Sequence, residues 1–157
     1  MEMKQYLTDT FKYNDKVNKQ VLNIIKTLPH KKESIYLFSH LINCQYRWMS
    51  RILQDSKAQE MDWFNPVYEL NELDSNWNDS LNLWLKYIEL KSDKELSGEV
   101  PFIGDDGEQY VSTPIDIAIQ LNYHSIHHRA QIQTLIRQQG ITPNFVDYIG
   151  TKYRKLT

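Results

Sequence analysis

Helical periodicity in four segments restricts the possible fold more than any other feature of this sequence. Apolar residues recur every three or four positions within residues 7–28, 33–53, 70–90 and 114–139. Such spacing gathers the apolar side chains on one face of a helix. Amphipathic helices of roughly 20 residues bury these faces by packing against one another. We therefore expect an all-α fold, a four-helix bundle.

The ends of these segments carry recognisable signals. Pro29 follows the first segment and stops a helix. The stretch "STPID" offers capping side chains and a proline near the start of the fourth segment, and Gly140 is placed to terminate it. Before the fourth segment, "EVPFIGDDGEQYVST" alternates on either side of an Asp-Gly pair, which predicts a short β-hairpin ahead of the last long helix. The long connection after the second segment favours a crossover over a simple up-and-down bundle.

Composition excludes several classes of function. Residues 1–157 contain no linker or repeat, so we expect a single domain. The formal net charge is -2 and no block of lysine or arginine occurs, which argues against nucleic-acid binding. No apolar run reaches the roughly 18 residues of a membrane span. The charged N-terminus and the single cysteine, Cys44, predict a cytoplasmic protein without disulfides.

Histidines are concentrated in the fourth segment, as His124, His127 and His128. With about 100° per residue, a helical wheel places His128 in the middle of the apolar arc and His124 at its edge. His127 falls at or beyond the border of that arc. His124 and His128 therefore point inward one turn apart, a spacing that allows both imidazoles to bind one divalent metal ion. The competing interpretation is a pair of core histidines satisfied by hydrogen bonds.

A third candidate ligand, His40, lies in the second segment near the arc of Leu37, Cys44 and Trp48. Three histidines from two helices form a half-open site, which is typical of a catalytic zinc ion. Cys44 follows His40 by one turn and offers a possible fourth ligand, although a small buried apolar role is the more frequent one for cysteine. His30, in the turn after Pro29, is expected to be solvated.

Arg47 and Arg51 lie one turn apart, near His40 on the wheel. We favour a solvated basic edge for them, and the alternative is an anion-binding rim for a substrate carboxylate. The tryptophans of the second and third segments are expected to pack in the core, with a pocket wall as the alternative. These are Trp48, Trp77 and Trp84.

Three stretches together resemble the DinB-like superfamily of metal-binding four-helix-bundle proteins, the DinB/YfiT group. They are "FKYNDKVNKQVLNIIKTLP", "LFSHLINCQYRWMSRI" and "NYHSIHHRAQIQTLIRQQGITPNFVDYI", which span nearly the whole chain in order. The resemblance implies that His40, His124 and His128 bind a divalent ion, the same residues that the wheel selects. Ala130 departs from the family, in which glycine often follows the arginine.

The resemblance also implies a range of activities. Characterised members are similar to thiol-dependent transferases or isomerases that use bacillithiol or mycothiol, and other members are described as metal-dependent hydrolases. Our leading hypothesis is a thiol-dependent S-transferase with zinc or nickel, a small-molecule substrate and no assignable catalytic acid or base. The alternatives are a hydrolase with the same ligands, or a non-catalytic, stress-related metal-binding bundle. The resemblance further implies a homodimer, for which Trp63, Phe64 and Tyr68 offer apolar contacts.

Overall fold

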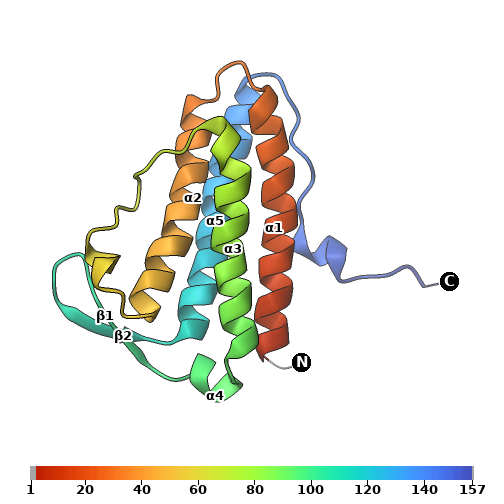
Figure 1. Cartoon of the computed structure of the whole chain (residues 1–157). Coiled ribbons are helices and arrows are strands. Elements are labelled where there is room, and N and C mark those ends of the chain that lie inside the picture. The colour runs from red at the N-terminus through yellow and green to blue at the C-terminus, as the bar shows by residue number, and fades with distance from the viewer. Residues whose placement is uncertain (1–2, 157) are drawn as a thin grey trace.

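Four long helices dominate the computed structural model, which describes residues 3–156 (Figure 1). They are α1 (Met3–Thr27), α2 (Lys32–Ile52), α3 (Leu73–Leu90) and α5 (Pro114–Gln138). A short helix and an antiparallel hairpin lie between α3 and α5: α4 (Asp93–Leu96), β1 (Val100–Ile103) and β2 (Gln109–Ser112). The expected all-α bundle with a hairpin before its last long helix is confirmed.

The order of the helices around the bundle follows from a crossover. Both α1 and α2 pack against α3 and against α5. In Figure 1, α1 and α5 run upward whereas α2 and α3 run downward, so residues 53–72 return along the outside of the bundle. This crossover contains two short 3-10 helices, η1 (Ser56–Gln59) and η2 (Leu70–Glu72). The crossover expected from the long connection is therefore confirmed, and α2 and α5 become antiparallel neighbours.

Local chemistry explains where α5 begins and ends. Thr113 is its N-cap, and the Thr113 hydroxyl accepts a hydrogen bond from the backbone N–H of Asp116. Pro114 occupies the first turn, where its missing N–H costs nothing. Gly140 has a φ of 77° and ends the helix with a left-handed residue, as predicted.

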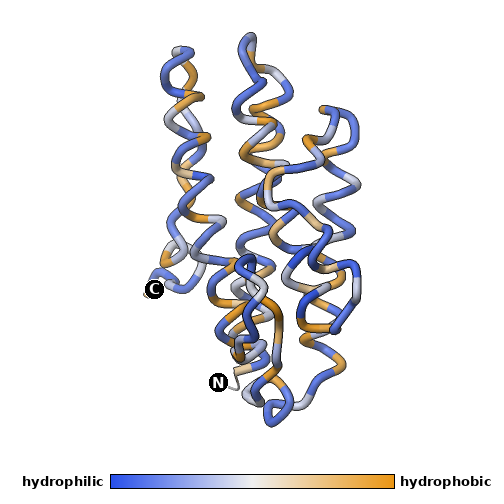
Figure 2. The backbone as a smooth tube through the Cα atoms, turned by 90° about the vertical axis from the view of Figure 1, so that its left-hand side faces the viewer, coloured by the Kyte–Doolittle hydropathy of each residue, from blue (hydrophilic) through white to orange (hydrophobic). Residues whose placement is uncertain are grey.

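The core lies between the four helices, whose apolar stripes alternate with polar residues along each helix (Figure 2). Trp77 and Trp84 are fully buried. Their indole N–H groups donate to Asp15 Oδ1 and to the backbone oxygen of Gln45, so neither N–H is left without a partner. The expected core position is confirmed for these two tryptophans, whereas Trp48 is only half-buried.

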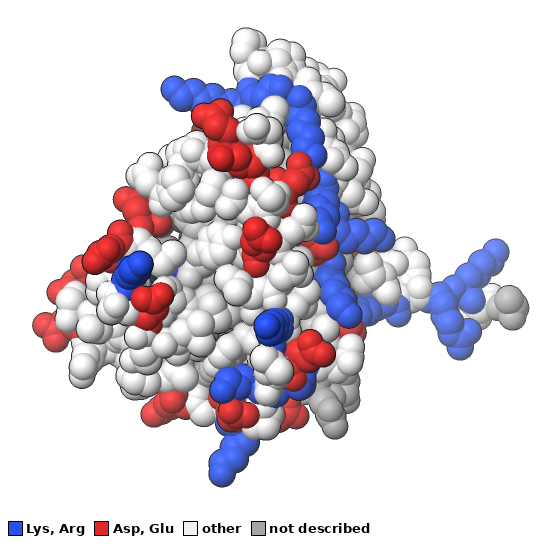
Figure 3. Space-filling model, viewed as in Figure 1, with Lys and Arg blue, Asp and Glu red and all other residues white. Residues whose placement is uncertain are grey.

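The hairpin packs against the C-terminal end of α2. Gln54 and Gln59 follow α2, and their amides donate to the backbone oxygens of Pro101 and Ile103 on β1. Gly107, with a φ of 83°, provides the positive φ that the hairpin loop needs. In Figure 3 acidic side chains gather on this side of the molecule, while basic ones form a column over α1. Among residues 3–156, no helix is long and apolar enough to cross a membrane.

Candidate metal centre

Helices α2 and α5 bring three imidazole rings together inside the bundle. His40 comes from α2 and is 4% exposed, while His124 and His128 come from successive turns of α5 and are half-buried. The ring centroids are 4.9 Å apart for His40 and His124, 4.7 Å for His40 and His128, and 4.4 Å for His124 and His128. The three rings are therefore neighbours, although the ligand atoms that lie within 4.8 Å of one another are those of His40, Cys44 and His124.

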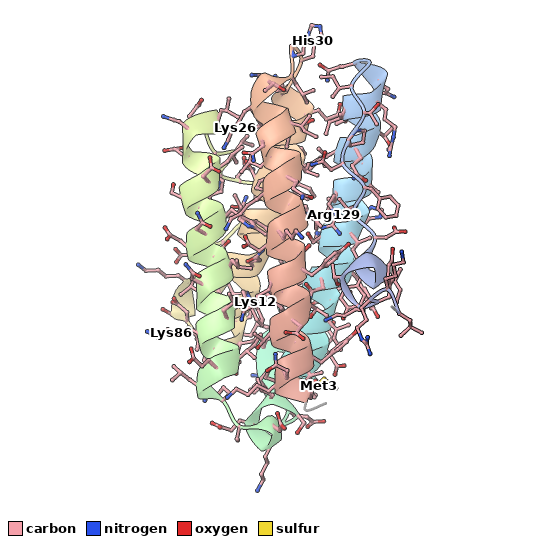
Figure 4. The ribbon with its side chains drawn as sticks, turned by 90° about the vertical axis from the view of Figure 1, so that its right-hand side faces the viewer. Met3, Lys12, Lys26, His30, Lys86 and Arg129 are labelled. Carbon is pink, nitrogen blue, oxygen red and sulfur yellow. The ribbon has the colours of Figure 1, made fainter. Side chains whose placement is uncertain are left out.

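The other two histidines lie outside this cluster. His127 is exposed, as the wheel predicted, although its ring neighbours that of His128. His30 is exposed in the α1–α2 turn, at the end of the bundle opposite Met3 (Figure 4). Neither is placed to bind an ion together with His40.

Hydrogen bonds orient the imidazole rings. The Nδ1–H of His40 donates to the backbone oxygen of Trp63 at 2.7 Å, and the Nδ1–H of His128 donates to Oε1 of Gln131 at 2.6 Å. Both bonds leave Nε2 as the nitrogen with a free lone pair. Metal-binding histidines in proteins usually have such a second partner, which fixes the tautomer and the ring orientation.

The distance between two ring nitrogens also suits a shared ion. Nε2 of His124 lies 2.8 Å from Nε2 of His40. Two nitrogen ligands of one zinc ion lie roughly 3 Å apart, given zinc–nitrogen bonds of about 2.0–2.1 Å. The residues present therefore fit a divalent ion.

Burial keeps these imidazoles in the form that binds metal. Burial lowers the pKa of His40 and of His128, in spite of the opposing hydrogen bonds from Trp63 and Gln131. Burial and the neighbouring histidines lower the pKa of His124 to about 4. Neutral imidazole is the metal-binding form, so all three side chains are ready to bind an ion at neutral pH.

Cys44 is the other ligand-type side chain at this position. Its Sγ lies 3.6 Å from Nε2 of His40 and 3.5 Å from Nε2 of His124, and the donor atoms of these three residues all lie within 4.8 Å of one another. Cys44 is buried in the core, and burial raises the pKa of its thiol to about 12, against the opposing charge of Arg47. A thiol must lose its proton to bind a metal, so Cys44 would have to release a proton before it could act as a ligand.

A partly open cavity of about 210 Å³ adjoins the cluster. It is lined by His40, Cys44, Trp48, Trp63, Gln120, Leu121 and His124. Trp48 packs against the core with part of its surface and also lines this cavity, so both roles expected for it are present.

The crossover segment supplies part of the site. Phe64 stacks on the ring of His40 at a centroid distance of 4.3 Å, and Trp63 both lines the cavity and accepts the His40 hydrogen bond. Trp63 and Tyr68 are half-buried against their own core. The sequence analysis proposed Trp63, Phe64 and Tyr68 as dimer contacts. It did not predict that Trp63 and Phe64 would contact His40.

Comparison with known families adds an independent line of support. The DinB family matches the sequence over residues 3–155. The chain belongs to the DinB family. No curated protein matches it. For this DinB-family chain, family membership and the cluster of His40, Cys44 and His124 both support a metal site between α2 and α5.

Beside the cavity, the structure corrects the expectation for Arg47 and Arg51. Both are buried, at 6% and 4% exposure, so they do not form a solvated basic edge. Nη2 of each guanidinium lies 2.6–2.7 Å from Oδ1 of Asp105 in the hairpin loop. The wheel placed the two arginines on the correct face, but Asp105 lies 54 residues beyond Arg51, and sequence spacing gives no sign of that contact.

Proposed function

We propose that this DinB-family protein is a metal-dependent enzyme whose divalent ion, zinc or nickel, is bound by His40, His124 and His128. The observation that carries the proposal is the convergence of three imidazoles beside a partly open cavity. Sites with three protein ligands leave a coordination position for water or substrate, which is the arrangement of catalytic zinc. His128 is preferred to Cys44 because its ring is anchored by Gln131 and needs no deprotonation.

We further propose that the reaction is a thiol-dependent S-transfer. An ion bound here would act as a Lewis acid that lowers the pKa of a bound thiol. Among the described residues that line the cavity, only Cys44 carries sulfur, and it is buried at 3% exposure. The nucleophilic sulfur must therefore come from a second molecule, a low-molecular-weight thiol. Hydrolysis is less well supported, since no carboxylate is among the described cavity residues to act as a general base.

Elemental analysis of untagged protein tests the ligands. We expect about one divalent ion per chain in the wild type, and loss of stoichiometric binding in His128→Ala. The matched control is His127→Ala, the exposed neighbour, which keeps the ion. Cys44→Ala also keeps it. Loss of the ion in Cys44→Ala together with retention in His128→Ala would show that the ligands are His40, Cys44 and His124 instead.

A conjugation assay tests the reaction class. Metal-loaded protein is incubated with monochlorobimane and a panel of thiols that includes bacillithiol and mycothiol. We expect conjugation with at least one thiol, and we expect chelation or His128→Ala to abolish it. If the metal is present and no thiol reacts, S-transfer is wrong and the hydrolase becomes the better explanation. A closed site in which Cys44 is a fourth ligand would favour a non-catalytic bundle.

Two further parts of the proposal concern the setting of the enzyme. We propose a cytoplasmic location, since the only cysteine is a free, buried thiol, as is common in a reducing compartment. We also propose a homodimer. Support comes from apolar side chains left exposed on the outer face of α5 and in the segment after it. These are Tyr123, Ile126, Phe145, Ile149, Tyr153 and Leu156.

A further inference from the structure

Two buried cations next to the cavity share a single carboxylate oxygen. The guanidiniums of Arg47 and Arg51 both contact Oδ1 of Asp105, and their side chains are 7% and 4% exposed. Within residues 3–156, the Nε atom of each arginine is buried and has no hydrogen-bond partner. Buried donors without partners are rare in folded proteins, because they lose hydration and gain nothing in return. The two arginines therefore carry more positive charge than the Asp105 carboxylate neutralises. They also have more N–H donors than this carboxylate pairs with.

Asp105 itself is on the surface. Its side chain is 56% exposed, and its second oxygen accepts a hydrogen bond from the indole N–H of Trp63 at 2.7 Å. Burial by itself would raise the pKa of Asp105, but the Trp63 hydrogen bond and the two guanidinium charges lower it, so the side chain is ionised. Asp62 lies near enough to be influenced by the charge of Arg47, but its carboxylate accepts backbone N–H bonds from Phe64 and Asn65. Asp105 thus lies between the two buried guanidinium groups and the solvent.

Two aromatic rings connect the arginine pair with the cavity. Cζ of Arg47 lies 4.1 Å from the Trp63 ring centroid, and Cζ of Arg51 lies 4.9 Å from Trp63 and 5.1 Å from Trp48. Both indoles also line the cavity that holds His40 and His124. A molecule bound there would have the histidine cluster on one side and the cationic pair just beyond the indole walls.

We propose that Arg47 and Arg51 form a binding site for the carboxylate group of a small molecule, and that Asp105 occupies this site in the free protein. A ligand carboxylate replaces that of Asp105 when the hairpin tip moves aside, and it can also accept from the donors that Asp105 leaves unpaired. Guanidinium groups bind carboxylates with two parallel hydrogen bonds, so the paired arginines favour this ligand class. The anion site needs no metal. The further step, that the bound carboxylate belongs to a substrate (a carboxylate-bearing thiol or electrophile), rests on the proposed function.

The binding test removes the built-in carboxylate and supplies one from solution. Asp105→Ala is titrated with succinate at constant ionic strength, and the arginine Nε–H signals are followed by ¹⁵N NMR. We expect signals of Arg47 and Arg51 to shift, with a succinate dissociation constant at least tenfold lower than in the wild type. Succinate should also raise the melting temperature of Asp105→Ala and leave that of the wild type unchanged.

Matched variants decide the outcome. Asp106→Ala removes the adjacent carboxylate of the same loop, which contacts Tyr110 and not the arginines, and it should show no gain in succinate binding. Adding Arg51→Met to Asp105→Ala should abolish the gain. If Asp105→Ala fails to fold, the same titration of Asp105→Asn replaces it, since asparagine keeps the shape of the side chain. A folded Asp105 variant that binds succinate no better than Asp106→Ala overturns the proposal.

Activity measurements separate this proposal from the proposed function. Where conjugation is observed, Arg51→Met should raise KM for a carboxylate-bearing partner at least tenfold and change kcat little. It should leave KM for an uncharged partner unchanged. An equal effect on both partners would refute the assignment to the substrate. Failure of the enzyme proposal would appear as missing turnover or missing metal, and neither affects the succinate titration.

Discussion

Arg129 shows how a single buried residue can set the rotation of a helix. It directly follows His128 and is 3% exposed, and its Nη1 donates to Oδ1 of Asn14 at 2.7 Å and of Asn18 at 2.8 Å. Figure 4 shows Arg129 between α5 and α1. Adjacent residues of α5 therefore face different helices, Arg129 toward α1 and His128 toward His40 of α2. The arginine contact fixes the face of α5 that carries the histidines.

The cost of removing an acceptor from this buried cation can be measured. Asn18→Ala leaves Arg129 with one amide partner and also removes the hydrogen bond from Asn18 to Ser125. We expect the free energy of unfolding to fall by about 1–3 kcal/mol, the range for a buried hydrogen-bonded group that loses its partner. Denaturant unfolding of Asn18→Ala, Arg129→Met and the double variant gives the coupling between them. Strictly additive effects would contradict the direct contact.

At the scale of elements, α4 depends on the capping box that begins it. Ser92 accepts from the backbone N–H of Glu95, while the Glu95 carboxylate accepts from the backbone N–H of Ser92 and pairs with Lys91. These contacts lower the pKa of Glu95 from its ordinary 4.5 to about 2. The hydrogen bond from the Ser92 backbone makes the largest contribution. Only the ionised carboxylate makes this set of contacts, so α4 is favoured when Glu95 is charged.

This shift predicts a pH-dependent contribution to stability. The folded-state pKa is below the ordinary value, so the contribution is complete above about pH 4.5 and disappears as the pH falls toward about 2. Glu95→Gln should therefore lower the melting temperature at pH 6, and lower it by a much smaller amount at pH 2.5. The exposed Glu89→Gln is the control. A difference between wild type and Glu95→Gln that is as large at pH 2.5 as at pH 6 would contradict the prediction.

Sequence patterns predicted the helices and the three histidines because both obey helical periodicity. His124 and His128 are four residues apart on one helix, so a wheel places them without knowledge of the other helices. The surroundings of the site could not be predicted in this way. Trp63 lies in a segment without periodicity, and Asp105 is in a hairpin loop more than 50 residues from Arg47 and Arg51. Contacts at such distances along the chain depend on the crossover and on hairpin packing, which no local pattern encodes.

At the scale of the whole molecule, the exposed apolar residues predict self-association. Phe145, Ile149, Tyr153 and Leu156 are between 62% and 81% exposed in the segment after α5. Burying such side chains against a second copy would be favourable by roughly 25 cal/mol per Å² of apolar surface. We expect light scattering at micromolar concentration to give twice the chain mass of 18.8 kDa.

Variants at this surface test the dimer further. Phe145→Asp combined with Tyr153→Asp should shift the protein to monomer. Leu90→Asp, which changes an apolar residue with 71% exposure on α3, should not. A wild-type monomer would refute the prediction, and a dimer unaffected by the double variant would place the interface elsewhere.

The crossover and the order of the helices also determine when the metal centre can form during synthesis. His40 and His124 are separated by 84 residues, with the crossover and the hairpin between them. A ribosome completes α2, the crossover and α3 well before it reaches His124 and His128. Until α5 emerges, His40 has no second imidazole beside it, and the apolar faces of α1 and α2 lack their shared neighbour. Loading of the proposed ion would therefore be among the last events in the maturation of this protein, and we expect ribosome-bound chains stalled before α5 to retain no ion.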